Sequence, residues 1–254
     1  MARIDINCDM GESYGNFKIG NDSAIFPYIT SCNIACGFHG GDPLHIEKTI
    51  KGALAYGVQI GAHPSYPDLA GFGRRNMQVP EEELRALVKY QIAALKGMVE
   101  SLGGQLRYVK PHGALYNTAA HQTVEAMAII KAIQEVDQSL YLMGLAGSPL
   151  EQLAIEKEIP FVAEAFADRK YMADGRLRSR SKIGAVIDSP DEAAQQVVDI
   201  VLRQQVETYE GEPWTLKAQS ICIHGDNPAA VAVLQAIDSQ LAENDITKVA
   251  FSHA

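Results

Sequence analysis

Ionisable side chains in this sequence gather directly after short apolar segments. Several carboxylates and four of the seven histidines occupy such positions, the histidines being His39, His63, His112 and His224. Imidazole and carboxylate groups are ligands for divalent transition metals, and they also transfer protons in catalysis. A single histidine at such a position is more often structural than functional. Four together predict a functional site in which at least two of them take part.

Some of these positions also have a structural explanation. Asp42, and Asp226 with Asn227, stand directly before a proline, which is typical of a helix N-cap followed by proline in the first turn. For these residues, capping and catalysis both remain open. Lys110 ends an apolar run, where a lysine is costly unless it is paired. It is therefore either an ion-pair partner or a catalytic cation.

Motifs that would identify a common enzyme class are missing. The sequence contains no H-E-x-x-H, no G-x-S-x-G and no G-x-x-x-x-G-K-[ST], and no G-x-G-x-x-G opens a helix after a predicted strand. These absences argue against a zincin and against a serine hydrolase with a nucleophile elbow. If ATP binds here, it binds without a Walker A loop.

The apolar runs themselves have the length and composition of strands buried on both faces. They predict strands at Ile4–Cys8, Ser31–Cys36, Gln59–Ala62, Tyr108–Lys110, Tyr141–Leu145, Phe161–Ala165 and Ser220–Ile223. Amphipathic patterns predict helices between them, the clearest over residues 84–102, 124–133, 190–202 and 231–241. Ser189 to Glu192 reads as a capping box. About seven βα units favour a closed or nearly closed β/α barrel over an open sheet.

Such a barrel brings the carboxyl ends of its strands to one face, where active sites form. One long irregular segment, residues 166–187, interrupts the βα pattern after the sixth predicted strand. It holds six of the 22 basic residues: Arg169, Lys170, Arg176, Arg178, Arg180 and Lys182. The concentration indicates an anionic ligand or partner, with a solvated loop as the alternative.

Composition limits the class of protein further. The chain has 254 residues, 47% of them hydrophobic, and a formal net charge of -9, which disfavours nucleic acid and anionic membranes as partners. No apolar run is long enough to span a bilayer, and the N-terminus lacks the apolar core of a signal peptide. The four cysteines form no C-x-x-C pair and suit reduced, buried thiols. We therefore expect a cytoplasmic protein that forms a single domain over residues 1–254.

Six separated motifs resemble those of the LamB/YcsF family, in the same order. They are Asn7-x-Asp9-x-Gly11-Glu12, Cys32-Asn33-x-Ala35-Cys36-Gly37-x-His39-x-Gly41-Asp42-Pro43, Gly61-Ala62-His63-Pro64-x-x-x-Asp68, Gly71-Phe72-Gly73-Arg74-Arg75, Val109-Lys110-Pro111-His112-Gly113-Ala114-Leu115-Tyr116-Asn117 and His224-Gly225-Asp226. The match runs from the first predicted strand to the last. Six motifs in order are far more specific than any one of them.

The resemblance implies a TIM-like, seven-stranded β/α barrel of the glycoside hydrolase/deacetylase superfamily, which agrees with the strand count. It also implies a subunit of an ATP-dependent 5-oxoprolinase that acts with two other subunits. That enzyme cleaves 5-oxo-L-proline to L-glutamate while it hydrolyses ATP to ADP and phosphate. A lactam is a resonance-stabilised amide, which gives a physical reason to couple its opening to ATP.

The roles that we expect for individual residues rest on this resemblance and on their positions. The catalytic candidates are Glu12, His39, Asp42, Lys110, His224 and Asp226. The candidates for substrate binding are Asn7, Arg74, Arg169, Arg178 and Arg180. Metal-dependent relatives in the superfamily use one carboxylate and two histidines, for which Asp9, His63 and His112 match best by position, with His39 as a substitute.

Two other functions remain open at this stage. A stand-alone metal-dependent deacetylase or amidohydrolase, acting on a sugar or N-acyl substrate, would use the same histidines and carboxylates. A non-catalytic binding partner is the second alternative. So many converging ionisable groups argue against the latter, because an interaction module has no need to gather them in one pocket.

Overall fold

Seven parallel strands form a closed barrel in the computed structural model, which describes residues 2–180 and 182–253. The barrel strands are β1 (Ala2–Met10), β2 (Ser31–Ala35), β3 (Gln59–His63), β4 (Leu106–Val109), β5 (Tyr141–Leu145), β6 (Phe161–Phe166) and β9 (Ser220–His224). Each pairs with the next in that order, and β9 closes the barrel by pairing with both β6 and β1. The predicted barrel and all seven predicted strands are thus confirmed, with small differences at their ends.

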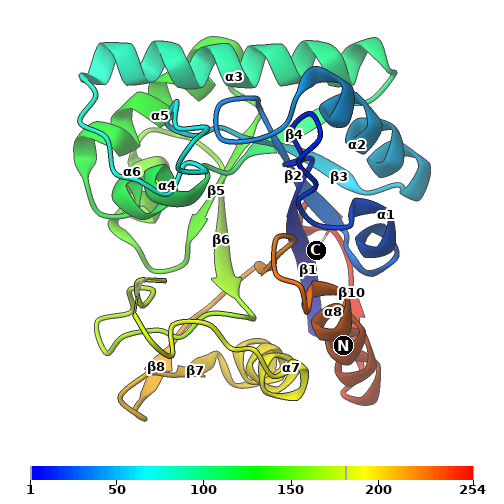
Figure 1. Ribbon diagram of the computed structural model, residues 1–254. Helices are drawn as coiled ribbons and strands as arrows, with labels where there is room; N and C mark the ends of the chain where they lie inside the picture. Colours follow the sequence, from blue (N-terminus) through cyan, green and yellow to red (C-terminus); the bar gives the residue numbers. More distant parts are fainter. Residues whose placement is uncertain (1, 181, 254) are drawn as a thin grey trace.

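Helices surround the barrel (Figure 1). They are α1 (Asp22–Ile25), α2 (Pro43–Tyr56), α3 (Glu81–Ser101), α4 (Gly113–Ala119), α5 (Thr123–Val136), α6 (Pro149–Glu156), α7 (Pro190–Val198) and α8 (Ala230–Glu243). Short 3-10 turns cover Phe26–Tyr28 and Phe251–His253, and α7 continues into a π-helical stretch at Asp199–Arg203. Helix α3 buries Leu84, Val88, Ile92, Leu95 and Val99 along the predicted stripe. None of the helices in the described chain is long and apolar enough to cross a membrane.

Two helices begin at the side-chain caps that the sequence suggests. The Ser189 hydroxyl accepts a hydrogen bond from the backbone N–H of Glu192 at the start of α7, which confirms Ser189 as the N-cap. The Glu192 carboxylate pairs with Lys170 Nζ at 2.7 Å, so only this half of the predicted capping box is observed. At the start of α2, Asp42 Oδ1 accepts from the backbone N–H groups of Leu44 and His45, at 2.9 and 3.1 Å. Asp42 is therefore an N-cap, as one of its two interpretations predicts.

Three short strands were not predicted. Strands β7 (Gln205–Glu207) and β8 (Pro213–Thr215) form an antiparallel pair, and β10 (Ile246–Lys248) runs parallel to the first residues of β1. Each has only three residues, too few to show a period in the sequence. The irregular basic segment packs against the β7–β8 pair, since Tyr171 bridges to Thr208 and its carbonyl accepts from the Tyr209 N–H at 2.7 Å. Figure 1 shows this lobe on the opposite side of the barrel from α3.

The core consists of apolar side chains between the strands and the helices, but the barrel interior is polar. Asp5, Asn7, Asn33, Lys110 and Glu164 are all at most 2% exposed, and each has polar partners inside the barrel. None of the four cysteines forms a disulfide, and three of them are buried. The interior thus fixes the strands through specific polar contacts as well as through apolar packing.

Gly61 in β3 allows the ring of Tyr108 in β4 to cross the strand backbone. A Cβ at Gly61 would lie 2.2 Å from Cε2 of Tyr108, whose ring is completely buried and has no room to move aside. Gly97 in α3 offers a matched control, because a Cβ there meets nothing within 4 Å.

We expect Gly61→Ala to lower the free energy of unfolding by about 1–3 kcal/mol through overpacking. Gly97→Ala should instead raise it, by up to about 1 kcal/mol, because alanine favours a helix interior. Denaturant unfolding of both variants measures the difference. Equal effects of the two substitutions would contradict this account of the β3–β4 contact.

Candidate functional site

A cavity of about 610 Å³ opens at the carboxyl ends of the barrel strands. Its wall includes residues that end or directly follow β1, β3, β4, β6 and β9, together with part of the basic segment. Eight of the predicted site residues line it: Asp9, His63, Arg74, Lys110, His112, Arg169, Arg180 and His224. The convergence of strand-end residues expected for a β/α barrel is therefore present.

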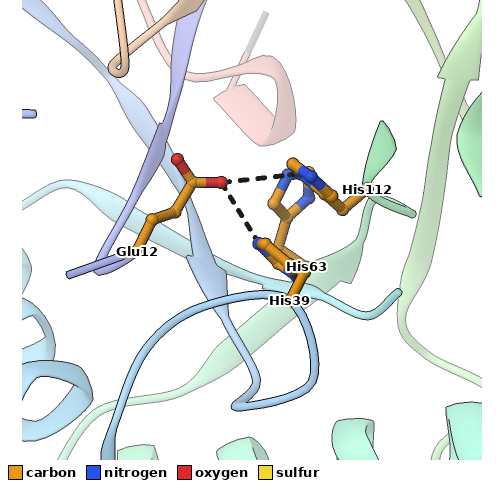
Figure 2. Close-up of side chains that lie close together, drawn as sticks. All are labelled: Glu12, His39, His63 and His112. Atoms are coloured by element: carbon orange, nitrogen blue, oxygen red, sulfur yellow. Dashed lines mark hydrogen bonds and ion pairs between the residues drawn. The ribbon is translucent and has the colours of Figure 1, made fainter. Parts of the chain in front are cut away.

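Next to this cavity, Glu12 and three histidines form a buried cluster (Figure 2). Glu12 Oε1 lies 3.1 Å from His39 Nε2 and 3.5 Å from His112 Nδ1. His63 Nε2 lies 3.0 Å from His112 Nδ1, and the rings of His39 and His112 stack at 3.7 Å. One ligand atom from each of the four residues lies within 4.8 Å of the others. The cluster thus combines two of the predicted metal ligands with two residues predicted to be catalytic.

Backbone carbonyls determine which imidazole nitrogens carry protons. His63 Nδ1–H donates to the carbonyl of Lys110 at 2.7 Å, and His112 Nε2–H donates to that of Phe72 at 2.9 Å. In the neutral rings this leaves lone pairs on His63 Nε2 and His112 Nδ1, which face each other. Histidines that bind a metal are typically held by such contacts to their second nitrogen.

Burial favours the uncharged forms of Glu12, His39 and His112. It lowers the pKa of His39 and of His112 well below the usual value, and the neighbouring histidines lower both further. Burial likewise raises the pKa of Glu12 well above its usual value, and the charge of Asp9 adds to this effect. The neutral imidazoles are the forms that act as metal ligands.

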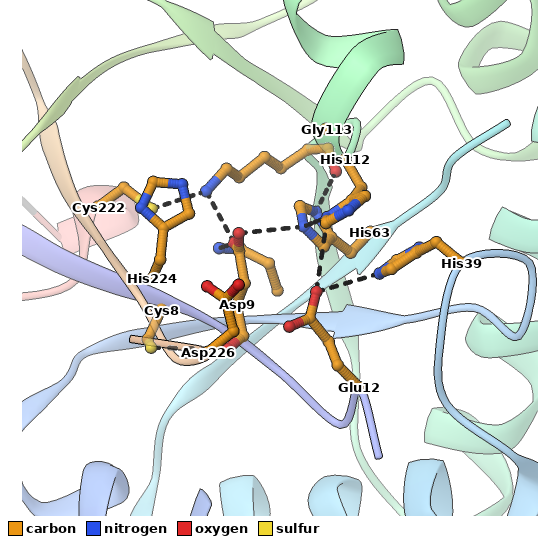
Figure 3. A network of polar contacts seen from close by, with 12 residues as sticks. Cys8, Asp9, Glu12, His39, His63, His112, Gly113, Cys222, His224 and Asp226 are labelled. Carbon is orange, nitrogen blue, oxygen red and sulfur yellow. Dashed lines mark hydrogen bonds and ion pairs between the residues drawn. The ribbon is translucent and has the colours of Figure 1, made fainter. Parts of the chain in front are cut away.

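The pKa of Asp9 is shifted in the opposite direction from that of Glu12. Burial alone would raise its pKa, but His63 and Lys110 hold it well below the usual range, so the carboxylate is ionised. Its Oδ1 accepts from Lys110 Nζ at 2.9 Å and from Asn33 Nδ2 at 2.8 Å, while Oδ2 lies 3.3 Å from His63 Nε2. In Figure 3, Asp9 lies between the Glu12–histidine cluster and the pair formed by Cys222 and His224.

Asn7 does not line the cavity, although it was predicted to bind substrate. It lies deeper in the barrel, where its amide donates to Glu164 Oε1 at 2.9 Å and its Oδ1 accepts from Asn33 at 2.7 Å. Asn7 Oδ1 also accepts from Lys110 Nζ at 3.2 Å. Its contacts position Lys110 and do not reach the cavity.

His224 is held by Asp168, a partner that sequence reasoning missed. His224 Nδ1–H donates to the Asp168 carboxylate, whose oxygens lie at 2.9 and 3.0 Å, and this leaves Nε2 as the ring's second nitrogen. Asp168 is 1% exposed, and although burial would raise its pKa, His224 helps to hold it below the usual value. Asp168 lies two residues after β6, so its strand-end position could have identified it as it identified the histidines. It belongs to the segment that the sequence analysis considered only for its basic residues.

Arginines form the outer wall of the cavity. Arg169 is 4% exposed, its Nε has no hydrogen-bond partner among the described residues, and burial together with Arg180 lowers its pKa to about 10. Arg176 and Arg180 line the same wall. Arg74 also lines the cavity and pairs with Asp226 at 2.5 Å, so Asp226 is occupied by an ion pair.

Two other predicted residues point away from the cavity. The Arg178 guanidinium stacks 3.5 Å above the ring of Tyr209, and its Nε donates to the carbonyl of Ile183. Arg178 therefore holds the basic segment on the β7–β8 lobe and is absent from the cavity wall. Asp42 Oδ2 accepts from the Gly15 N–H at 2.8 Å and contacts His45 Nδ1, in addition to its capping bonds. These contacts hold the pKa of Asp42 below its usual value, and both of its carboxylate oxygens have hydrogen-bond partners.

Comparison with solved structures extends the fold assignment. The structure matches a lactam utilization protein from Thermus thermophilus with a TM-score of 0.92 and 42% identity, covering 98% of this chain and 99% of that one. A family 4 carbohydrate esterase from Streptomyces lividans matches with a TM-score of 0.51 at 11% identity, over 97% and 91% of the two chains. The second likeness extends to the fold alone.

Comparison with sequences gives the family. The chain is 52% identical over 239 residues to a protein from Acinetobacter baylyi that is named as a 5-oxoprolinase subunit, and the match covers 94% of each chain. It is 49% identical over 251 residues to a protein of the same name from Photorhabdus laumondii, which covers 99% of this chain and all of that one. The model of the LamB/YcsF family matches residues 4–254. The chain therefore belongs to the LamB/YcsF family.

Proposed function

We propose that this chain is a subunit of an ATP-dependent 5-oxoprolinase and holds the lactam in the cavity at the barrel mouth. With two partner subunits it would convert 5-oxo-L-proline to L-glutamate while ATP is hydrolysed to ADP and phosphate. Its unpaired cysteines suit action in the cytoplasm. The observation that carries the proposal is the pairing of a cationic wall with proton-transferring groups in the cavity of a chain so similar to proteins named as 5-oxoprolinase subunits.

The charges in the cavity fit this substrate. 5-Oxoproline carries one carboxylate and one neutral lactam. Arg169 and Arg180 offer a partly desolvated site for the carboxylate, where charge-assisted hydrogen bonds are strong. The lactam would then lie toward Lys110 and His63 on the inner wall.

The reaction begins with transfer of the γ-phosphoryl group of ATP to the lactam oxygen, as the ring nitrogen loses its proton. Water then adds to the activated carbon and gives up a proton. The carbon–nitrogen bond then breaks as the ring nitrogen takes up protons, which leaves the γ-acyl phosphate of glutamate. A second water hydrolyses this acyl phosphate to glutamate and phosphate. We assign the water's proton to His224 Nε2, because Asp168 fixes Nδ1–H and stabilises the imidazolium that forms. The positive charge of Lys110 stabilises the negative charge that develops on the substrate oxygen.

A divalent metal would fit the Glu12–histidine cluster. In the neutral rings, lone pairs of His63 Nε2 and His112 Nδ1 face each other at 3.0 Å, and a cation bound to both nitrogens would stabilise that contact. Nitrogens bound to a tetrahedral zinc lie about 3.4 Å apart, close to this separation. Glu12 and His39 would complete the set, with Asp9 beside it. Such a metal would polarise an oxygen of the substrate or of water.

The chain should bind one zinc or cobalt ion per molecule after chelator treatment. Calorimetric titration measures the stoichiometry, and the visible spectrum of the cobalt form reports histidine ligands independently of activity. His63→Ala and His112→Ala should abolish saturable binding. His121→Ala is the matched control, because His121 lines the cavity but lies outside the cluster. Equal loss in all three variants, or no saturable binding to the original chain, would contradict the metal site.

Reconstitution tests the proposed function directly. The chain mixed with both partner subunits, 5-oxoproline and ATP should form glutamate and phosphate in equal amounts, and none of the three by itself should form either. His224→Gln should lower turnover about a hundredfold or more, since a proton-transfer group is lost. Glutamate formation that does not depend on this chain would refute the proposal. Release of acetate from N-acetylated sugars by the isolated chain would support the deacetylase alternative.

The pH dependence of the reconstituted enzyme tests the role of Asp168. Burial and Arg180 lower the pKa of His224, whereas Asp168 raises it. Asp168→Asn should therefore move the His224 limb of the kcat/KM profile to lower pH, and Asp168→Glu should restore part of the shift. Asp174→Asn, at an exposed position of the same segment, is the control. An unchanged profile with a lower Tm would show that Asp168 serves folding only.

A further inference from the structure

A second hollow, of about 430 Å³, lies on the other side of the chain segment that carries Glu12. Gly11 and Ser13, the two neighbours of Glu12, line this hollow, together with Lys18, Lys48 and Tyr56. The cavity at the barrel mouth shares none of these residues. The hollow is therefore a separate feature, and one short stretch of backbone joins it to the cluster.

Three exposed apolar residues are direct chain neighbours of residues that line the hollow: Tyr14 follows Ser13, Phe17 precedes Lys18 and Leu44 precedes His45. Tyr14 and Phe17 close a tight turn through paired backbone hydrogen bonds of 3.0 and 2.9 Å, yet they are 41% and 77% exposed. Leu44, in the first turn of α2, is 58% exposed. Tyr14 and Phe17 are paired across the turn, and exposed aromatic groups that lie together are typical of an interaction surface.

Hydrogen bonds attach the backbone of the turn to its base and to the start of α2, so the positions from which the two rings project are defined before any partner arrives. The Gly15 N–H donates to Asp42 Oδ2 at 2.8 Å, and Lys18 Nζ donates to His45 Nε2 at 3.0 Å. The Ser13 hydroxyl accepts from the Ile19 N–H at 3.0 Å and so closes the base of the turn. A surface fixed beforehand loses little conformational entropy on binding.

The charge around the hollow indicates what it binds. Lys18 and Lys48 are exposed at its wall, although the chain as a whole has a net charge of -9. Asp22, the acidic residue of the lining, is turned inward, where it accepts from the Thr49 hydroxyl and from the Gly11 N–H. Two exposed lysines thus line the hollow, and exposed apolar residues adjoin its lining residues in the chain, which complements an acidic segment with apolar flanks.

We infer that the hollow, with Tyr14, Phe17 and Leu44, is the docking surface for an acidic, apolar-flanked segment of another 5-oxoprolinase subunit. The inference rests on the proposed function, since it needs a partner subunit. It also connects binding of the partner subunit to the position of Glu12 in the cluster. A partner that contacts Gly11 and Ser13 shifts or fixes Glu12, whose carbonyl accepts from the Gly41 N–H and whose side chain meets His39.

Binding of tagged partner subunits to full-length variants tests the docking surface. Tyr14→Ser combined with Phe17→Ser should weaken binding about a hundredfold, because two aromatic anchors are lost. Lys48→Glu should weaken it at low salt and less at high salt. The controls are Ile155→Ser and Lys157→Glu, at exposed positions of α6 and its end. They should bind as the original chain does.

Each outcome has a definite meaning. Normal binding by the double variant, when the original chain forms an active complex, overturns the docking surface and leaves the proposed function intact. Failure of the original chain to bind the partners or to support glutamate formation overturns both. Light scattering on the isolated chain detects self-association. A dimer that the double variant abolishes, with partner binding unchanged, would mean that a second copy occupies the surface and would overturn the assignment to a partner.

Discussion

The buried ammonium group of Lys110 is the interaction on which the rest of the site depends. The side chain is 2% exposed and follows β4, while its partners Asp9, Glu164 and Cys222 belong to β1, β6 and β9. A charge in a barrel interior costs several kcal/mol unless its partners are in place. These four strands must therefore keep their register for the charge to be tolerated, and the carbonyl of the same residue orients His63.

Two neighbouring carboxyl groups have pKa values shifted in opposite directions. Asp9 remains ionised because His63 and Lys110 offset its burial, whereas burial and the charge of Asp9 raise the pKa of Glu12. Groups with pKa values driven apart in this way can take different roles within one site. Here the ionised Asp9 carboxylate anchors the inner wall, and Glu12 joins three histidines in a cluster that could hold a metal.

The remaining parts of the site come from segments outside the barrel strands. The basic segment is held on the β7–β8 lobe by Tyr171 and Arg178, and this arrangement places Arg169 at the cavity wall. Asp168 in the same segment orients His224. Outside the cavity, Asp42 connects the start of α2 to the turn that we assign to a partner surface. In our proposal, substrate binding and assembly thus depend on loops that are held in place by hydrogen bonds to fixed elements.

The sequence by itself determined the barrel, its seven strands, the Ser189 cap and the gathering of histidines at strand ends, because apolar runs and strand-end positions are local features. Only the tertiary structure decided which of those side chains meet. Glu12 and His39 join His63 and His112 through turns whose direction no local pattern records. His224 and Asp168, 56 residues apart, pair because β6 and β9 are neighbours. Arg178 lies outside the cavity because its guanidinium stacks on the ring of Tyr209. This is a contact between two loops, which the periodicity of the sequence does not reveal.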